Sequence, residues 1–146
     1  MGKRNPGKTP EPFDSEVKLE HPIYVIQEHR ASHLHWDLRL EFNGVLKSWA
    51  VPKEPPTEEG VKRLAVQVED HPLSYATFEG TIPEGEYGAG DVRLWDYGTF
   101  DVLEEKEGEY VLDIKGRRLK GAYALIQTRM GGNPKNWLLF RRKGVS

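Results

Sequence analysis

The sequence contains no cysteine, which excludes disulfides, thiol catalysis, zinc–cysteine sites and iron–sulfur clusters. It has no run of about 18 apolar residues of the kind that crosses a bilayer. Its first residues lead into no apolar stretch of signal-peptide length, so we do not expect secretion by that route. These absences predict a cytoplasmic protein with no membrane partner.

Helical periodicity is scarce, whereas alternation of apolar and polar residues recurs in nine short runs. The runs cover residues 23–29, 33–42, 45–51, 63–68, 92–95, 99–103, 110–114, 122–128 and 137–140. Many short strands at close spacing predict an all-β fold, a compact closed or nearly closed β-barrel of short antiparallel strands with at most short helical turns. Residues 1–20 show no period, so we expect an extended N-terminal arm there and a single barrel domain over residues 21–146.

Charge is spread unevenly along the chain, although the net charge is only −2. Residues 61–109 hold four basic residues against twelve acidic ones, whereas residues 110–146 hold nine basic residues and a single acidic one. An asymmetry of this size suggests a polyanionic partner for the basic end. The alternative is a solvated basic tail that contributes only solubility.

Residues 33–42 alternate without a break between apolar and ionisable side chains. The apolar set comprises Leu34, Trp36, Leu38, Leu40 and Phe42, and the ionisable set comprises His33, His35, Asp37, Arg39 and Glu41. Burial of each apolar side chain is worth about 1.5–3 kcal/mol, so the core fixes the register and forces the ionisable row onto the other face. The ordinary alternative for such a row is a solvated face with cross-strand ion pairs.

A candidate metal site lies at the start of this row. His35 and Asp37 project in parallel from one strand, and His29 ends the preceding strand only a short turn away. Two imidazoles and a carboxylate make a mixed nitrogen and oxygen site for Mn²⁺, Fe²⁺ or Zn²⁺, and Mn²⁺ suits it if a phosphate oxygen also binds. His33 is a candidate substrate contact outside the ligand set.

Two further side chains have the chemistry of phosphate binding. Arg39 offers a rigid guanidinium fork on the same face as Asp37, although an ion pair with Asp37 or Glu41 would also explain it. His71 precedes Pro72, which holds it extended at a strand end. It is a candidate for contacting a phosphoryl oxygen or protonating a leaving group, and the alternative is a structural turn histidine.

Five segments of the chain closely resemble the 3′-phosphoesterase domain of DNA ligase D. They are QEHRASHLHWDLRLE at 27–41, GVLKSWAVPK at 44–53, RLAV at 63–66, EDHPL at 69–73 and FEGTIPEGEYGAG at 78–90. The likeness runs from about residue 4 to residue 142, nearly the whole chain.

The resemblance implies a β-barrel enzyme that depends on Mn²⁺, or on another divalent transition metal, and acts at the 3′ ends of DNA primers. Such an enzyme removes a 3′-terminal ribonucleoside in a phosphodiesterase step and then the 3′-phosphate in a phosphomonoesterase step. The 3′-OH that remains serves repair by non-homologous end joining. The expected partners are damaged primer–template ends and a separate ligase and polymerase, and we expect a stand-alone, nucleoid-associated monomer.

The resemblance also implies roles for particular residues. The metal ligands correspond to His29, His35 and Asp37, and the phosphate contacts to Arg39 and His71. Further catalytic candidates are Gln27, Lys53, Arg63, Glu69 and Tyr75. The arm matches at Arg4 and Glu11 as substrate contacts, but Asn5 replaces the usual Asp. Because the family's arm is linked to the phosphodiesterase step, this departure bears on the balance between the two steps.

Two other kinds of function compete with this interpretation. A cupin-like small-molecule metalloenzyme also mounts two histidines and a carboxylate in a β-barrel, but the basic C-terminal third argues against it. A non-catalytic adaptor that binds DNA ends would not need the intact ligand set. Because no Ser or Thr lies on the ligand face of residues 33–42, we expect direct attack by water rather than a covalent intermediate.

Overall fold

The computed structural model describes residues 19–86 and 89–142, so Arg4, Asn5 and Glu11 of the predicted arm lie outside the described residues. Nine strands run in the order β1 (Ile23–Arg30), β2 (Leu34–Phe42), β3 (Val45–Val51), β4 (Lys62–Pro72), β5 (Gly80–Ile82), β6 (Gly90–Lys106), β7 (Glu109–Lys115), β8 (Lys120–Gln127) and β9 (Asn136–Arg141). Two 3₁₀ helices, η1 (Leu73–Thr77) and η2 (Met130–Gly132), are short, as predicted.

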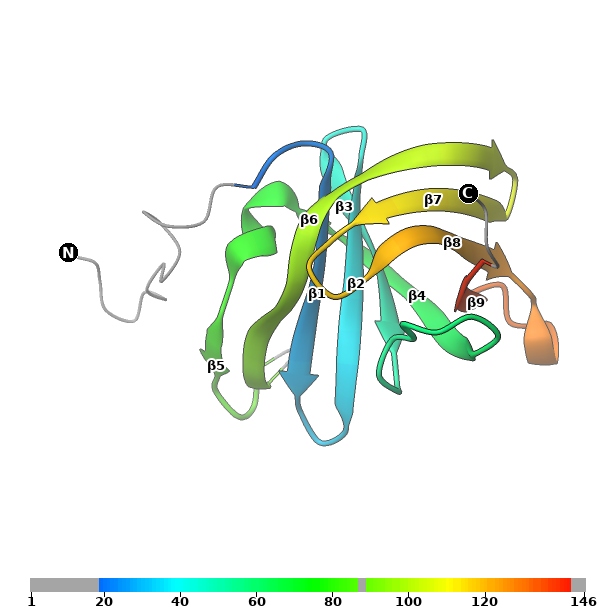
Figure 1. Ribbon diagram of the computed structural model, residues 1–146. Helices are drawn as coiled ribbons and strands as arrows, with labels where there is room; N and C mark the ends of the chain where they lie inside the picture. The colour runs from blue at the N-terminus through cyan, green and yellow to red at the C-terminus, as the bar shows by residue number, and fades with distance from the viewer. Residues whose placement is uncertain (1–18, 87–88, 143–146) are drawn as a thin grey trace.

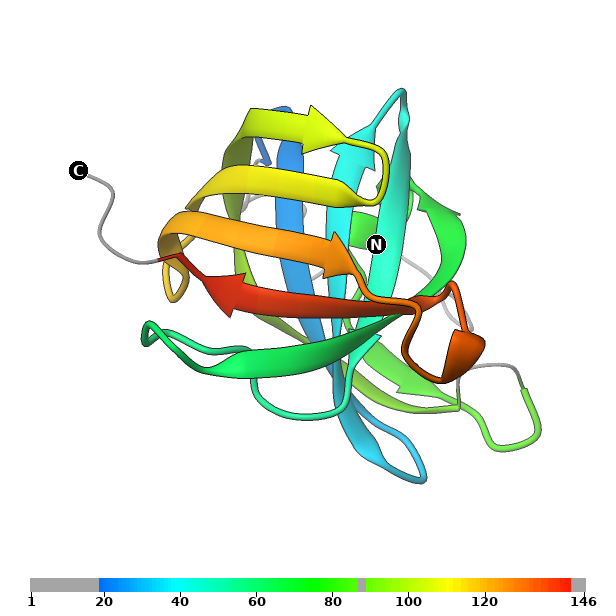
Figure 2. The same ribbon diagram turned by 90° about the vertical axis from the view of Figure 1, so that its right-hand side faces the viewer.

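Eight of the strands close into an antiparallel barrel, which confirms the predicted fold class. Hydrogen bonding runs in the order β1-β2-β3-β4-β9-β8-β7-β6, and β6 pairs back onto β1 to complete the ring. The short β5 adds only to the first residues of β6. Figure 2 shows β7, β8 and β9 with the second half of β6 as one layer that crosses β1, β2 and β3.

The prediction of separate strands at 92–95 and 99–103 was wrong, because β6 is one strand of 17 residues. Its first half pairs with β1, and its second half pairs with β7 from Thr99 onward. Gly98 makes no turn; a side chain there would collide with the backbone of Lys115, so the glycine permits a close approach of two strands. Strand β5 and helix η1 were not predicted at all.

The barrel interior holds the main hydrophobic core. It includes Trp36, Leu38 and Leu40 from β2, which confirms the predicted apolar face, and Phe42 packs against this core. Leu34 differs, because it is 38% exposed at the start of the strand. Among the tryptophans, Trp36, Trp49 and Trp137 are buried as expected, whereas Trp95 is only partly buried.

A second, smaller core lies on the outer surface of the barrel. Val25 and Leu46 point away from the interior because successive side chains on a strand alternate, and Ala76 of η1 packs against them. Figure 1 shows η1 and β5 beside β1 and β6, away from β7 and β8. This small core therefore attaches the segment between β4 and β6 to the outer face of the barrel. Over the described residues, no helix is long and apolar enough to cross a membrane.

Candidate metal and phosphate site

Three residues of the ionisable row line a cavity on the outer face of the barrel. The cavity has a volume of about 680 Å³, and its lining includes His35, Asp37 and Arg39 of β2. Strand β1 contributes His29, and the segment from β4 to η1 contributes His71 and Tyr75. The barrel interior is filled with hydrophobic side chains, so the cavity lies outside it. Helix η1, strand β5 and their flanking loops give the cavity its shape.

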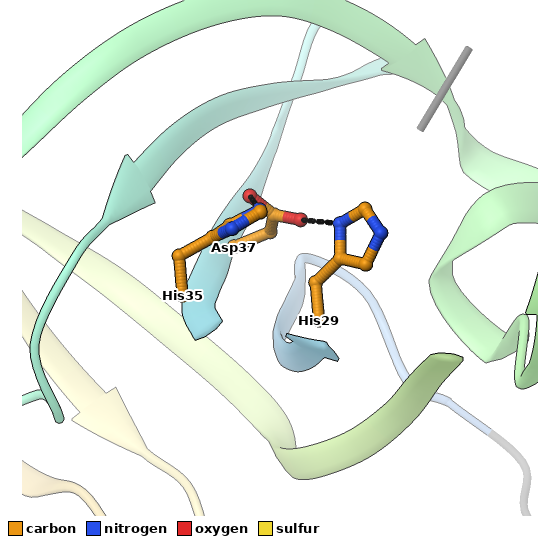
Figure 3. A group of neighbouring side chains, drawn as sticks. All are labelled: His29, His35 and Asp37. Carbon is orange, nitrogen blue, oxygen red and sulfur yellow. Dashed lines mark ion pairs between the residues drawn. The ribbon is translucent and has the colours of Figure 1, made fainter. Parts of the chain in front are cut away.

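His29, His35 and Asp37 form a compact donor cluster, shown in Figure 3 with the three side chains converging. One donor atom from each residue lies within 4.8 Å of the others. His29 Nδ1 lies 3.6 Å from Asp37 Oδ2, and His35 Nε2 lies 3.3 Å from Asp37 Oδ1. The convergence follows from strand pairing, since His29 is the direct partner of His35 across the β1–β2 hairpin.

Asp37 is 7% exposed, yet its surroundings favour the ionised form. Burial alone would raise the pKa of its carboxyl group, but the contacts with His29 and His35 and the charge of Arg39 outweigh burial and hold that pKa well below its usual value. The carboxylate is therefore available as a metal ligand at neutral pH. A divalent ion fits this donor set, because two imidazoles and one ionised carboxylate converge on the wall of an accessible cavity.

Arg39 is anchored beside the cluster by buried polar side chains. Its Nε donates to Gln27 Oε1 at 2.7 Å, its Nη1 donates to Ser48 Oγ at 2.8 Å, and its Nη2 lies 3.4 Å from Asp37 Oδ2. Gln27 in turn donates to the carbonyl oxygens of Tyr75 and Phe78, so it joins the arginine to η1 and the residue after it. The guanidinium is thus fixed in one orientation, although it is only 3% exposed.

His71 and Tyr75 form the wall next to Arg39. His71 Nδ1 lies 3.1 Å from Arg39 Nη1 and 3.0 Å from the Glu69 carbonyl oxygen, so Nε2 is the ring nitrogen that can meet a ligand. Burial and then the charge of Arg39 lower the pKa of His71, which favours the neutral ring. The Tyr75 ring stacks near both side chains, with its centroid 4.8 Å from Arg39 Cζ and 5.0 Å from the His71 ring.

The other predicted site residues are placed in different surroundings. Glu69 lines the cavity, and Gln27 is buried beneath it. Lys53 is exposed and Arg63 partly buried, but neither is among the residues that line this cavity; Arg63 borders a separate hollow and donates to the Glu54 carbonyl oxygen. His33 is exposed, and its carbonyl oxygen lies 3.2 Å from His35 Nδ1.

Ser48 is a site residue that the sequence analysis missed. It is fully buried and bridges Arg39 to the Leu46 carbonyl oxygen. The Asn43-Gly44 turn could have revealed Ser48. A two-residue hairpin loop fixes the register between β2 and β3, and this register places Ser48 opposite Arg39.

Comparison with known proteins places the chain in a family. Residues 27–127 match the family model described as the DNA ligase D 3′-phosphoesterase domain. This chain is a member of that family. It is 46% identical over 97% of its length to the multifunctional non-homologous end joining protein LigD of Pseudomonas aeruginosa. It is 49% identical over 96% of its length to the multifunctional non-homologous end joining DNA repair protein LigD of Mycobacterium tuberculosis.

The chain spans about a fifth of the length of these relatives: 18% of the Pseudomonas aeruginosa protein and 19% of the Mycobacterium tuberculosis protein. The donor cluster, Arg39, His71 and Tyr75 all lie inside the segment that matches the family model.

Proposed function

We propose that this chain is a metal-dependent phosphoesterase that restores 3′-OH groups at DNA ends. It removes a 3′-terminal ribonucleoside and then the 3′-phosphate, with Mn²⁺ as the preferred ion. The family and the names of the relatives support a role in end joining, in which a DNA ligase and a polymerase would use the repaired end.

One observation carries the proposal: a fixed guanidinium lies beside a ready set of metal ligands in a single open cavity. The Arg39 side chain touches Asp37 at 3.4 Å and His71 at 3.1 Å, so one phosphate group can reach both the donor cluster and the guanidinium. A hydrolase for phosphate esters needs this adjacency, because the same group must be held, polarised and attacked. The cavity opens on the outer face of the barrel, where a polymer end can enter.

The protein side chains divide the remaining work. His29, His35 and Asp37 would hold the ion, which when bound polarises a non-bridging phosphate oxygen and lowers the pKa of a water ligand. Arg39 donates to the other phosphate oxygens and stabilises the charge that develops on them in the transition state. His71 presents Nε2 to a phosphate oxygen or to the leaving group.

Water is the attacking group in this proposal. Strand β3 brings the Ser48 hydroxyl beside Arg39, but this group is fully buried, donates to the Leu46 carbonyl oxygen and accepts a hydrogen bond from Arg39. It is therefore a support for Arg39 and a poor candidate for a nucleophile.

The two steps break different bonds at the same phosphorus atom. In the first step water replaces O5′ of the terminal ribonucleoside, which leaves with a proton, and a 3′-phosphate remains. In the second step water replaces O3′ of the primer, which takes up a proton and becomes the 3′-OH, while inorganic phosphate departs. Arg39 can hold the same phosphate group in both steps, whereas only the first step requires a grip on an additional sugar.

The test uses two labelled primer–templates, one ending in a 3′-ribonucleotide and the other in a 3′-phosphate, each incubated with and without Mn²⁺. We expect the first substrate to pass through the 3′-phosphate to the 3′-OH, and the second to give the 3′-OH directly. Binding of both DNAs without turnover would favour a non-catalytic adaptor. Turnover of a small acid in the absence of DNA would favour a cupin-like metalloenzyme.

A further inference from the structure

The turn between β7 and β8 is built on a buried carboxylate. Asp96 of β6 is 1% exposed, and it accepts hydrogen bonds from the backbone N–H groups of Arg117, Arg118 and Leu119 at 2.7–3.0 Å. Tyr24 donates its hydroxyl to the same carboxylate at 2.7 Å. Four donors on one buried group hold this turn firmly against β6.

Two consecutive arginines project from the turn, and each is stacked on an aromatic ring of β6. Arg117 Cζ lies 4.0 Å from the ring centroid of Tyr97, and Arg118 Cζ lies 4.4 Å from that of Trp95. Arg117 Nη1 donates to the Tyr97 carbonyl oxygen, and Arg118 Nε donates to the Trp95 carbonyl oxygen. Both guanidinium groups are therefore pre-oriented, so little conformational entropy is lost when they bind a ligand.

These contacts leave most of each guanidinium available. Both arginines are exposed, and in the part of the chain that the structure describes no carboxylate side chain forms an ion pair with either guanidinium. A guanidinium has five N–H donors, and the bond of each arginine to the carbonyl oxygen beneath it uses one of them. The flanking Lys120 is exposed as well, whereas the exposed Lys115 is paired with Asp101 at 2.7 Å, so the positive charge of the turn comes mainly from the two arginines and Lys120.

Arg117 lies on the same side of the sheet as the metal and phosphate site. Its stacking partner Tyr97 packs against the small outer core, and so does Tyr75 of the cavity wall. In the β1–β6 pairing, Tyr97 lies opposite Val25 and Val92 lies opposite His29. Four residues of strand separate the two positions, which is about 13 Å. This distance equals about four base-pair steps of 3.4 Å along the axis of a DNA duplex.

We propose that Arg117 and Arg118 form a docking surface for the sugar–phosphate backbone of duplex DNA, about four base pairs from the 3′ end held at Arg39. The partner is identified by chemistry: two guanidinium groups that are fixed on rings two positions apart in β6, and that form no ion pair with a carboxylate side chain of the described residues, suit the phosphates of a polyanion. The inference rests on the proposed function for its substrate, but it concerns a surface outside the catalytic cavity.

The experiment measures equilibrium binding of a 12-base-pair duplex with a 3′-phosphate, in the absence of divalent metal, at several salt concentrations. We expect the double variant Arg117→Gln, Arg118→Gln to bind more weakly. The slope of log K against log salt is negative, and its magnitude is expected to fall by about 1.8, which is about 0.9 for each lost phosphate contact. Arg117→Lys keeps the charge and is expected to retain most of the slope.

Lys62→Gln is the matched control, since Lys62 is also an exposed cation stacked on a ring, 5.3 Å from the centroid of Phe140. We expect it to leave the slope unchanged. An unchanged slope in the double variant, with duplex binding by the natural chain intact, would overturn the docking surface alone. Absence of duplex binding by the natural chain would overturn the proposed function. Melting temperatures of all variants separate a binding defect from a loosened turn.

Discussion

Arg39 Nη2 lies 3.4 Å from Asp37 Oδ2, so the candidate phosphate-binding guanidinium touches a candidate metal ligand directly. Both side chains are buried, and they alternate with the core residues of the same strand. This contact lets one side chain serve two purposes: against the effect of burial, Arg39 helps His29 and His35 to lower the pKa of Asp37, and it faces any phosphate that reaches the metal site. The sequence left open whether Arg39 binds phosphate or pairs with Asp37. In the structure the pair with Asp37 is part of the candidate phosphate site.

Substitution of a metal ligand is expected to remove activity while the fold is retained. Asp37→Asn keeps the shape of a buried side chain, and His35→Ala removes a partly exposed one. We expect phosphate release from a 3′-phosphate primer to fall at least about 100-fold in both variants, since even indirect disturbance of metal ligands costs 10–100-fold. Circular dichroism checks the fold, and near-normal metal-dependent release in either variant would show that the ligand assignment is wrong.

Ser48→Ala is expected to lower stability as well as activity. It removes an acceptor from the buried Arg39, which costs about 1–3 kcal/mol in the free energy of unfolding. Ser74→Ala in η1 is the control, because Ser74 is exposed and its loss is expected to change stability by less than about 0.5 kcal/mol. Urea unfolding compares the two, and equal stability of both variants would contradict the anchoring role of Ser48.

Arg39→Lys is expected to separate phosphate handling from metal binding. Lysine keeps the positive charge but cannot reproduce the planar set of bonds to Gln27, Ser48 and Asp37. We expect the rate on the 3′-phosphate primer to fall about 10²-fold or more, whereas Mn²⁺ affinity measured by calorimetry stays within a few-fold. Arg93→Lys, at an exposed position of β6, serves as the control. Unchanged turnover by Arg39→Lys would mean that a positive charge at this position is enough for phosphate handling and that the planar guanidinium is not required.

The N-terminal arm is expected to act on one step only. Deletion of residues 1–12 removes Arg4 and Glu11, which the family resemblance links to removal of the ribonucleoside. We expect that step to be suppressed while 3′-phosphate removal continues, because only the longer substrate has a sugar beyond the scissile phosphate. Rates on the two primers, with and without the arm, decide the matter. An equal loss on both would assign the arm to stability or general binding.

Sequence patterns predicted β1, β2 and β3 to within about one residue at each end, and β2 most clearly, because its unbroken alternation places Trp36, Leu38 and Leu40 in the barrel interior. It failed at β5, which is only three residues long and has no pattern of its own. It also failed at Gly98, where a glycine that usually marks a turn instead permits close packing of two strands.

The donor cluster was predictable because strand alternation and a short hairpin bring His29 opposite His35. The burial of Arg39 was not predictable from the sequence, since it depends on η1 and on side chains such as Gln27 that other strands contribute. A charged row on an outer face normally meets solvent, and only the segment from η1 to β5 turns part of this row into a cavity.

The central claim is that His29, His35 and Asp37 hold a metal that acts with Arg39 on a 3′-phosphate. Its most direct test is single-turnover release of inorganic phosphate from a 3′-phosphate primer–template while Mn²⁺ is titrated, for the natural chain and for Asp37→Asn. We expect release to rise with Mn²⁺ and to saturate in the natural chain, and to stay at background in the variant. Release that ignores Mn²⁺, or an identical titration curve for Asp37→Asn, would contradict it.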